Sequence, residues 1–292
     1  MKPIHIRPLL FAVIYLLLVN IASAKRIEMT LVGSTPADAP IKSLLGIAAN
    51  KNVDFIKWDI DLINEDNGGP KKFSLTVNYG VSQPNTLGFI NGGEKLNVNG
   101  SYSLQTGNIY RLSNGISFLQ VNNNIFQLLS HDGSLMKGGG GWSYTFNRKD
   151  PVAVTAKAIS LVSTAFAPGD KSTQVIFEGR TPCMEIAGGN QMAVKEDCFK
   201  LKWKFTLNRN PTTLQPSSFT MRQVDGTAKE IEGKWTIIKE NTAIIYKLEP
   251  SVGVTFYLMA GDYNVLYFVD KNLNLYQGNK DFSYTLNRRI LN

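Results

Sequence analysis

The sequence predicts an all-β protein made of two tandem antiparallel β-barrels joined by a short helical linker. Three observations predict it: the two halves of the chain match each other, apolar and polar residues alternate in short segments, and turn residues separate these segments every ~8–12 residues. We expect the first barrel at residues 25–149, the linker at residues 150–173 and the second barrel at residues 174–292.

The internal duplication is clearest near the end of each half. Trp142-Ser-Tyr-Thr-Phe-Asn-Arg148 matches Phe282-Ser-Tyr-Thr-Leu-Asn-Arg288 at five of seven positions. Further matches keep the same order in both halves: Gly33-Ser-Thr-Pro36 with Gly179-Arg-Thr-Pro182, Lys57-Trp58 with Lys202-Trp203, Gly100-Ser-Tyr102 with Gly233-Lys-Trp235, and Ile109-Tyr-Arg-Leu112 with Ile245-Tyr-Lys-Leu248. Chance does not produce so many collinear matches, so the chain holds two copies of one module.

Each copy has the residue pattern of half-buried β-strands. Trp142, Tyr144 and Phe146 alternate with polar residues, and Leu201, Trp203 and Phe205 do the same in the second copy. Turn signals such as Asn-Gly and Asp-Gly separate the runs. Roughly seven or eight strands per copy are most simply arranged as a closed or nearly closed barrel, because closure removes exposed edges.

The segment between the copies favours a helix that packs on a barrel. Asp150 can cap a helix whose first residue is Pro151, and Pro168-Gly169 would end it. Apolar residues then fall on one helical face: Val152, Ala156, Ile159, Val162 and Phe166. The β-branched residues of this segment leave a strand open as the alternative.

Eight aromatic positions recur in the two copies and are the candidate lining of a barrel interior. They are Trp58, Tyr102, Tyr110 and Tyr144 in the first copy and Trp203, Trp235, Tyr246 and Tyr284 in the second. Such residues fill the core of a small barrel, or line a cavity for one apolar ligand if the interior is hollow. The sequence does not distinguish a filled from a hollow barrel.

The N-terminus predicts export. A basic start with Lys2 and Arg7, an apolar run over residues 9–19 and Ala22-Ser-Ala24 form the layout of a signal peptide at residues 1–24. The run reaches only ~17 Å, too short for a transmembrane anchor. We expect a mature chain without a transmembrane anchor, in the periplasm or outside the cell. The net charge of +8 is scattered, so nucleic acid is not an expected partner.

Both cysteines, Cys183 and Cys198, lie in the second copy. An oxidising destination and the joint absence of both from the first copy predict a disulfide between them. Reduced thiolates together with Met184 and Met192 would instead favour Cu(I), which the predicted bond excludes. We expect neither a metal nor a cofactor.

The mature sequence offers little for catalysis. Its one histidine, His131, lies in a Ser-His-Asp-Gly turn and is expected to be exposed. Asp59 and Asp61 share one strand face and are expected to be solvated, although paired carboxylates can act as acid and base. The run Gly138–Gly141 lacks a following lysine and helix, so we interpret it as a tolerant hairpin loop.

The stretch Val175-Ile-Phe-Glu-Gly-Arg-Thr-Pro-Cys183, followed by a strand that holds Trp203, resembles the opening of NlpE-type copper-resistance and envelope-stress lipoproteins. The resemblance implies a lipocalin-like barrel in the cell envelope. It covers about 40 residues. Ile186 stands where the family motif has its second cysteine, and the lipid-anchoring cysteine of the family is missing.

Three functions remain open at this point. We expect an exported, non-catalytic binding protein of the envelope, whose partner is a small apolar ligand or an envelope protein. The alternative is a structural, envelope-stress or inhibitor-like protein with filled barrels. A carboxylate-based hydrolase is the third hypothesis. A binder predicts a lined cavity, a structural protein predicts packed interiors, and a hydrolase predicts two converging carboxylates.

Overall fold

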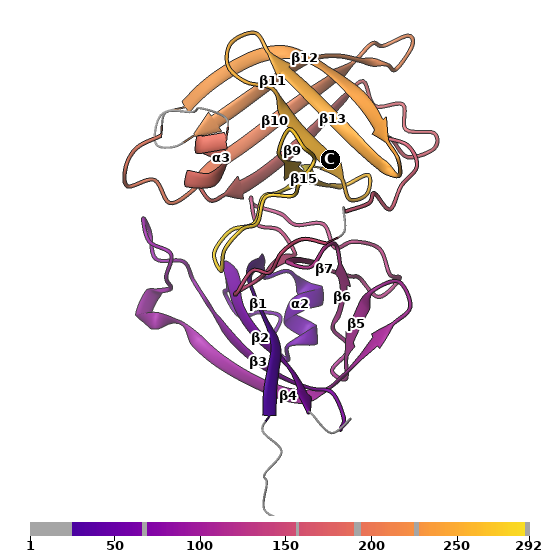
Figure 1. Ribbon diagram of the computed structural model, residues 1–292. Coiled ribbons are helices and arrows are strands. Elements are labelled where there is room, and N and C mark those ends of the chain that lie inside the picture. The colour runs from indigo at the N-terminus through magenta and orange to yellow at the C-terminus, as the bar shows by residue number, and fades with distance from the viewer. Residues whose placement is uncertain (1–24, 66–68, 156–157, 190–193, 225–227, 290–292) are drawn as a thin grey trace, which may run out of the picture.

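The computed structural model describes residues 25–65, 69–155, 158–189, 194–224 and 228–289. Within these ranges the chain forms two closed eight-stranded antiparallel barrels, one beside the other along the molecule (Figure 1), so the predicted fold class is confirmed. The first barrel consists of β1 (Lys25–Pro36), β2 (Phe55–Glu65), β3 (Lys72–Gly80), β4 (Glu94–Gln105), β5 (Ile109–Leu112), β6 (Ser117–Gln120), β7 (Ile125–Leu128) and β8 (Thr145–Arg148).

The second barrel repeats the arrangement with strands β9 (Gln174–Thr181), β10 (Leu201–Arg209), β11 (Pro216–Val224), β12 (Ala228–Glu240), β13 (Ala243–Pro250), β14 (Phe256–Ala260), β15 (Val265–Val269) and β16 (Thr285–Arg289). Short helices lie between the first two strands of each copy, namely α2 (Ala39–Leu44) and α3 (Met184–Gly189). A 3-10 turn, η1 (Ile90–Gly92), precedes β4. Among the described residues, no helix combines the length and the apolar composition needed to cross a bilayer.

Each strand pairs with its neighbours in sequence, which is an up-and-down order. The barrels close where the first and last strands meet, β1 with β8 and β9 with β16. At these seams both copies have a glycine, with little room for a side chain at Gly33 and none at Gly179. A Cβ on Gly33 would lie 3.1 Å from the Thr145 carbonyl oxygen, and one on Gly179 would lie 2.4 Å from the Thr285 carbonyl oxygen.

The interior of each barrel holds a cluster of buried hydrophobic side chains. On β10, for example, Leu201, Trp203, Phe205 and Leu207 alternate inward with the more exposed Lys202, Lys204 and Thr206. Ile41 of α2 adds to the first core, and Ile186 of α3 adds to the second. An eight-stranded barrel is narrow enough for side chains alone to fill it.

The repeated Gly-x-Thr-Pro and Lys-Trp motifs meet in space. The buried indole N–H of Trp58 donates to the Thr35 hydroxyl at 2.9 Å, and that of Trp203 donates to the Thr181 hydroxyl at 2.8 Å. A buried indole needs an acceptor. This requirement explains why the two motifs recur together in both copies.

The barrels pack against each other around an approximate two-fold axis, so that matching residues meet. Ser143 bonds to Ser283 at 2.6 Å, and Thr145 bonds to Thr285 at 2.9 Å; all four side chains are buried. Each pair joins the same position of the two copies. This is the pattern of an isologous interface, here formed within one chain.

Two asparagines, one from each copy, accept matching hydrogen bonds across this interface. The Gly138 N–H donates to Oδ1 of Asn287 at 2.7 Å, and the Gly278 N–H donates to Oδ1 of Asn147 at 2.8 Å. A Cβ on Gly138 would lie 1.9 Å from the Trp142 carbonyl oxygen, and one on Gly278 would lie 2.3 Å from that of Phe282. The interpretation of the glycine run as a tolerant loop is therefore wrong at Gly138, which the interface fixes.

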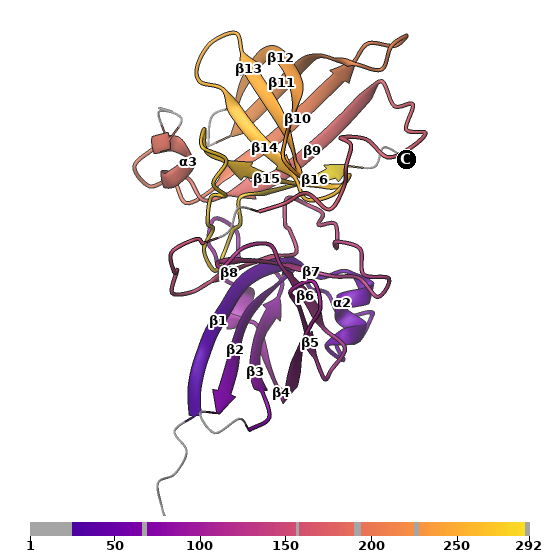
Figure 2. The same ribbon diagram turned by 45° about the vertical axis from the view of Figure 1, so that its right-hand side comes forward.

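An apolar cluster shared by both barrels completes the interface. Leu129 and Leu135 of the first barrel lie in one cluster with Met259, Val265 and Tyr267 of the second. The loop between β15 and β16 also reaches from the second barrel to the first in both views (Figures 1 and 2). The two barrels are therefore held by apolar and polar contacts together.

The described part of the linker contains bends and turns but no helix, so the helical prediction is wrong for residues 150–155 and 158–173. The physical reason is that several of its polar backbone groups bond to the two barrels, as Val152 does to Asn124 of the first barrel. The Leu161 N–H donates to the Gly261 carbonyl at 2.8 Å, and the Ala165 carbonyl accepts from the Tyr246 hydroxyl at 2.5 Å. Val162 and Phe166 still pack on the second core, as the apolar pattern predicted.

The disulfide between Cys183 and Cys198 is confirmed. It ties the start of α3 to the residues that precede β10, and Cys183 is buried in the second core. The predicted signal peptide at residues 1–24 lies outside the described residues.

Candidate binding groove between the barrels

The eight recurrent aromatic residues all lie inside the barrels. Trp58, Tyr102, Tyr110 and Tyr144 belong to the first core, and Trp203, Trp235, Tyr246 and Tyr284 belong to the second. They contact one another and other rings. Tyr102 stacks on Tyr110 with ring centroids 6.1 Å apart, and Trp235 stacks on Tyr246 at 5.4 Å.

The polar atoms of several of these rings also bond to protein groups. Besides the two Trp–Thr bonds, the Tyr102 hydroxyl donates to Glu28 at 2.7 Å and the Trp235 indole donates to the Asn208 carbonyl at 2.8 Å. Rings that pack together in this way act as core, although the buried Tyr144 hydroxyl has no hydrogen-bond partner among the described residues. Their role as the lining of a ligand cavity stays a prediction.

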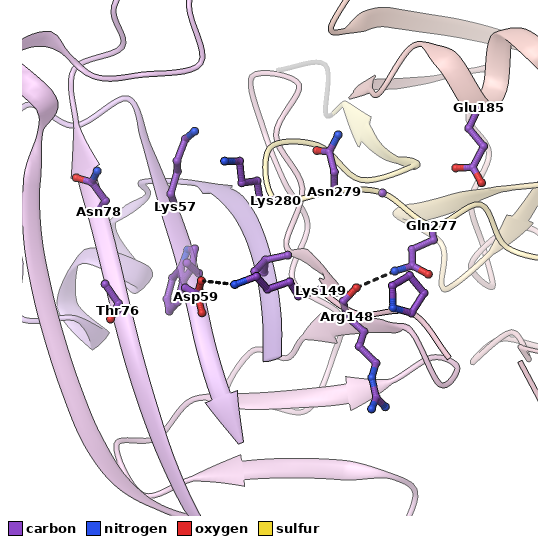
Figure 3. Close-up of a pocket in the computed structure, with 14 residues that line it drawn as sticks. Lys57, Asp59, Thr76, Asn78, Arg148, Lys149, Glu185, Gln277, Asn279 and Lys280 are labelled. Atoms are coloured by element: carbon purple, nitrogen blue, oxygen red, sulfur yellow. Dashed lines mark hydrogen bonds and ion pairs between the residues drawn. The ribbon is translucent and has the colours of Figure 1, made fainter. Parts of the chain in front are cut away.

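A groove of about 870 Å³ lies outside the barrels, at the junction of the two copies (Figure 3). The first barrel provides one wall from the outer faces of β2 and β3, and the end of β8 with the start of the linker continues it. The loop before β16 and α3 provide the second wall. The lining residues are Val32, Lys57, Trp58, Asp59, Thr76, Asn78, Arg148, Lys149, Pro151, Glu185, Gln277, Gly278, Asn279 and Lys280.

Charged groups in the groove come from both copies. Lys57 pairs with Asp281 across the junction at 2.5 Å, and Lys149 lies 4.0 Å from Asp59 within the first barrel. The ammonium group of Lys280 has no ion-pair or hydrogen-bond partner among the residues that the structure describes. Lys280 is exposed, so its charge is available to a ligand.

The two carboxyl groups of the lining, Asp59 and Glu185, come from different barrels, and the pKa of each is raised. Partial burial raises the pKa of Asp59, while Lys149 lowers it and Asp61 raises it further. Partial burial also raises the pKa of Glu185, against a hydrogen bond with Tyr284 that lowers it. Figure 3 shows Asp59 beside Lys149 and places Glu185 further away, on the second barrel.

The groove is held in shape by bonds that cross the junction. The Gln277 side chain donates to the Arg148 carbonyl at 2.8 Å, as Figure 3 shows. The Asn147 amide donates to the Asn279 carbonyl at 3.0 Å, and the Ser34 hydroxyl donates to the Lys280 carbonyl at 2.9 Å. A groove whose walls are tied in this way is formed before any ligand arrives.

The structure places the other predicted residues as follows. His131 is exposed in a turn, as expected. Asp59 and Asp61 lie on the outer face of β2, where Asp61 accepts a hydrogen bond from Thr30 at 2.6 Å. Within the described ranges, no three His, Cys, Asp or Glu residues come together as metal ligands would.

The sequence argument missed the groove residues. Of its lining, Lys57, Trp58, Asp59, Arg148 and Pro151 had been named, and none of these as part of a groove. One signal in the sequence could have indicated the junction. Asn147 and Asn287 occupy the same position of the two matching seven-residue segments. A polar residue that recurs at the same position of both copies indicates a fixed hydrogen bond, here the one at the junction.

Comparison of the chain with protein-family models, with curated proteins and with solved structures found no match.

Proposed function

We propose that the mature chain is an exported, non-catalytic binding protein of the cell envelope that holds a small ligand in the groove between its barrels. One observation carries the proposal: the groove measures about 870 Å³ and draws its lining from both copies. Typical small-molecule sites measure roughly 300–1,000 Å³. The two interiors, in contrast, are occupied by the hydrophobic cores.

The lining indicates the kind of ligand. Pro151 and Val32 of β1 supply apolar contact, while Lys280, Asn78 and Asn279 supply donors. A molecule with an apolar body and a polar or negatively charged end fits this arrangement. The proposed ligand differs in place from one held among the interior aromatic residues.

Two observations support export. The disulfide requires an oxidising compartment to persist, and the N-terminal residues have the layout of a signal peptide. The eight-stranded up-and-down order is the one that lipocalins have, which supports the NlpE-like, lipocalin-like assignment as part of this proposal.

The second candidate function is a structural, envelope-stress or inhibitor-like protein whose partner is another protein. The hydrophobic clusters inside both barrels favour it over a binder with an interior ligand. Exposed apolar side chains on the linker, including Val152, Val154 and Leu161, would then be a place of contact.

Native mass spectrometry of the full mature protein, purified from its own source, tests the proposal. We expect a non-covalent mass of a few hundred daltons on the wild type, largely lost in Lys280→Glu. Lys239→Glu makes the same charge change on an exposed residue of β12 and should keep the added mass. A bare wild-type mass, or equal retention in Lys280→Glu, would refute the groove as a ligand site.

A further inference from the structure

A second hollow, of about 320 Å³, lies beyond the Lys57–Asp281 pair and shares no lining residue with the groove. The loop at residues 82–87 of the first barrel forms one side. Trp142 and Phe282 form the junction side, and Arg180 and Lys200 line it from the second barrel. This hollow therefore also lies between the copies. Unlike the groove, it is lined by an arginine and a lysine of the second copy.

Two cations face this hollow without a counter-ion. Neither the Arg180 guanidinium nor the Lys200 ammonium has an ion-pair or hydrogen-bond partner in the part of the chain that is described. Arg180 of β9 also lies directly opposite Lys202 of β10. Like charges at opposite positions of a strand pair are destabilising, so the cluster is unfavourable unless an anion joins it.

The carboxylates that line the hollow are already engaged elsewhere. Asp54 accepts from the Ser82 N–H at 2.7 Å and from the Ser82 hydroxyl at 2.8 Å. Asp281 is bonded to Lys57 at 2.5 Å. Neither acid has a bond to Arg180 or Lys200 among the described residues, so the positive charge stays uncompensated.

An aromatic stack holds one of the cations in place. Phe55 stacks on Trp142 with centroids 4.6 Å apart, and Trp142 stacks on Phe282 at 5.5 Å. The Arg180 guanidinium lies 5.0 Å from the centre of the Trp142 ring. A guanidinium held against a ring is oriented before binding. Less side-chain conformational entropy is then lost when it binds a ligand.

The two copies differ at these cationic positions. Arg180 matches Ser34, and the register of the Lys-Trp motifs matches Lys200 with Phe55. The neighbouring Thr and Trp residues are the same in both copies because the fold needs them. The charge therefore belongs to the second copy alone and is not a requirement of the barrel.

We propose that this hollow binds an oxyanion, the carboxylate or phosphate group of a small molecule, with Arg180 and Lys200 as its two cationic partners. The planar guanidinium can donate two parallel hydrogen bonds to such a group, and the ammonium adds a third. The site goes beyond the ligand groove, because its residues and its charge are separate from those of the groove.

The pKa values of Lys200 and Arg180 are consistent with two cations that lack a counter-ion. Burial lowers the pKa of Lys200, and the positive charges of Arg180 and Lys202 lower it further. Burial also lowers the pKa of Arg180. A bound oxyanion would raise both, so binding should weaken as the pH rises through the lowered pKa of Lys200. The acids that face the cluster, Asp54 and Asp281, are bonded elsewhere.

Isothermal titration calorimetry of the full mature chain tests the site, with inorganic phosphate and succinate as separate probes against sodium chloride at equal ionic strength. We expect one-site saturation by at least one probe, and which probe binds identifies the phosphate or the carboxylate. Arg180→Ser, which restores the residue of the first copy, and Lys200→Gln should each weaken binding about tenfold or more.

Lys239→Gln removes one exposed positive charge from β12 and should keep the wild-type affinity. Absence of saturable heat with both probes, or wild-type affinity in Arg180→Ser, would overturn the proposal. If a variant fails to fold, NMR of the wild type decides: added phosphate or succinate should shift the Arg180 Nε and Trp142 Nε1 resonances. Resonances of Arg180 and Trp142 that stay unchanged with both probes would overturn the proposal.

Discussion

At the scale of single residues, the Thr–Trp pair shows why particular side chains recur in both copies. Thr181 is fully buried and Trp203 is nearly so, and their bond of 2.8 Å joins β9 to β10 inside the second barrel. An indole N–H that loses its acceptor in such a place cannot turn to water. The pair therefore stabilises the barrel mainly by preventing an unpaired buried donor.

Thr181→Val removes the acceptor and keeps the shape of the side chain. We expect it to lower the free energy of unfolding by about 1–3 kcal/mol. Thr181→Ser keeps the hydroxyl and should lose less. Urea unfolding followed by tryptophan fluorescence measures both. Equal losses for valine and serine would mean that packing, and not the hydrogen bond, is responsible.

The stability of the turn at residues 130–134 should depend on pH. Asp132 accepts bonds from the Ser130 hydroxyl, from the Ser134 N–H at 2.9 Å and from the Ser134 hydroxyl at 2.7 Å. These bonds, that of Ser130 first, lower the pKa of Asp132 to about 2. Since the ordinary value is near 3.9, the turn is stabilised above that pH and loses the contribution as the pH falls towards 2.

An NMR titration of the Asp132 carboxyl should therefore give a midpoint near 2 in the wild type. Ser130→Ala removes the largest cause and should raise the pKa towards its ordinary value. A wild-type midpoint near 3.9 would show that the hydroxyl bonds do not persist in solution.

At the scale of elements, the junction is held by two matching bonds that can be broken one at a time. Asn147→Ala removes the acceptor of the Gly278 N–H, and Asn287→Ala removes that of the Gly138 N–H. Because about 1–3 kcal/mol is lost with a buried bond, each variant should speed exchange at its own amide by about tenfold or more.

Hydrogen–deuterium exchange measures both amides in the same sample. Each variant serves as the control for the other, since Asn147→Ala should leave Gly138 protected and Asn287→Ala should leave Gly278 protected. Simultaneous loss of protection at both amides would instead mean that the two barrels separate as a unit.

The disulfide acts on the second barrel alone. It closes a loop with a sequence separation of 15 residues, which in the chain-entropy model contributes ~3 kcal/mol. The double variant Cys183→Ser, Cys198→Ser should lower the stability of the second barrel by about that amount and leave the first unchanged. Denaturant unfolding followed by amide signals from each barrel tests this, and an equal effect on both would contradict it.

At the scale of the whole molecule, the duplication made the architecture predictable. Matching motifs such as Lys57-Trp58 and Lys202-Trp203 gave the two copies and their strands, because each motif reflects a local need of one barrel. The cysteine pair was predictable because both cysteines are absent together from the first copy and the N-terminus indicates an oxidising destination. The linker was not, because its apolar pattern suits any segment that lies on a barrel, and its backbone bonds depend on where Tyr246 and Gly261 lie.

The groove could not be predicted from the sequence, for a related reason. Lys57 and Asp281, which meet across the junction, are 224 positions apart, and nothing local to either residue requires the other. Only the two-fold packing of the copies brings them together. Arg180 carried a readable signal, because it replaces a serine within an otherwise repeated motif, and such a difference between copies marks a position that the fold does not constrain.

The most direct test of the central claim, that this is a binder whose ligand lies between the barrels, is a crystal structure of the mature protein purified from its own source. The account predicts electron density for a small molecule in the groove, in contact with Lys280, Asn78 and Pro151. Density enclosed by either barrel beside Trp58 or Trp203, or a groove that holds only water, would contradict it.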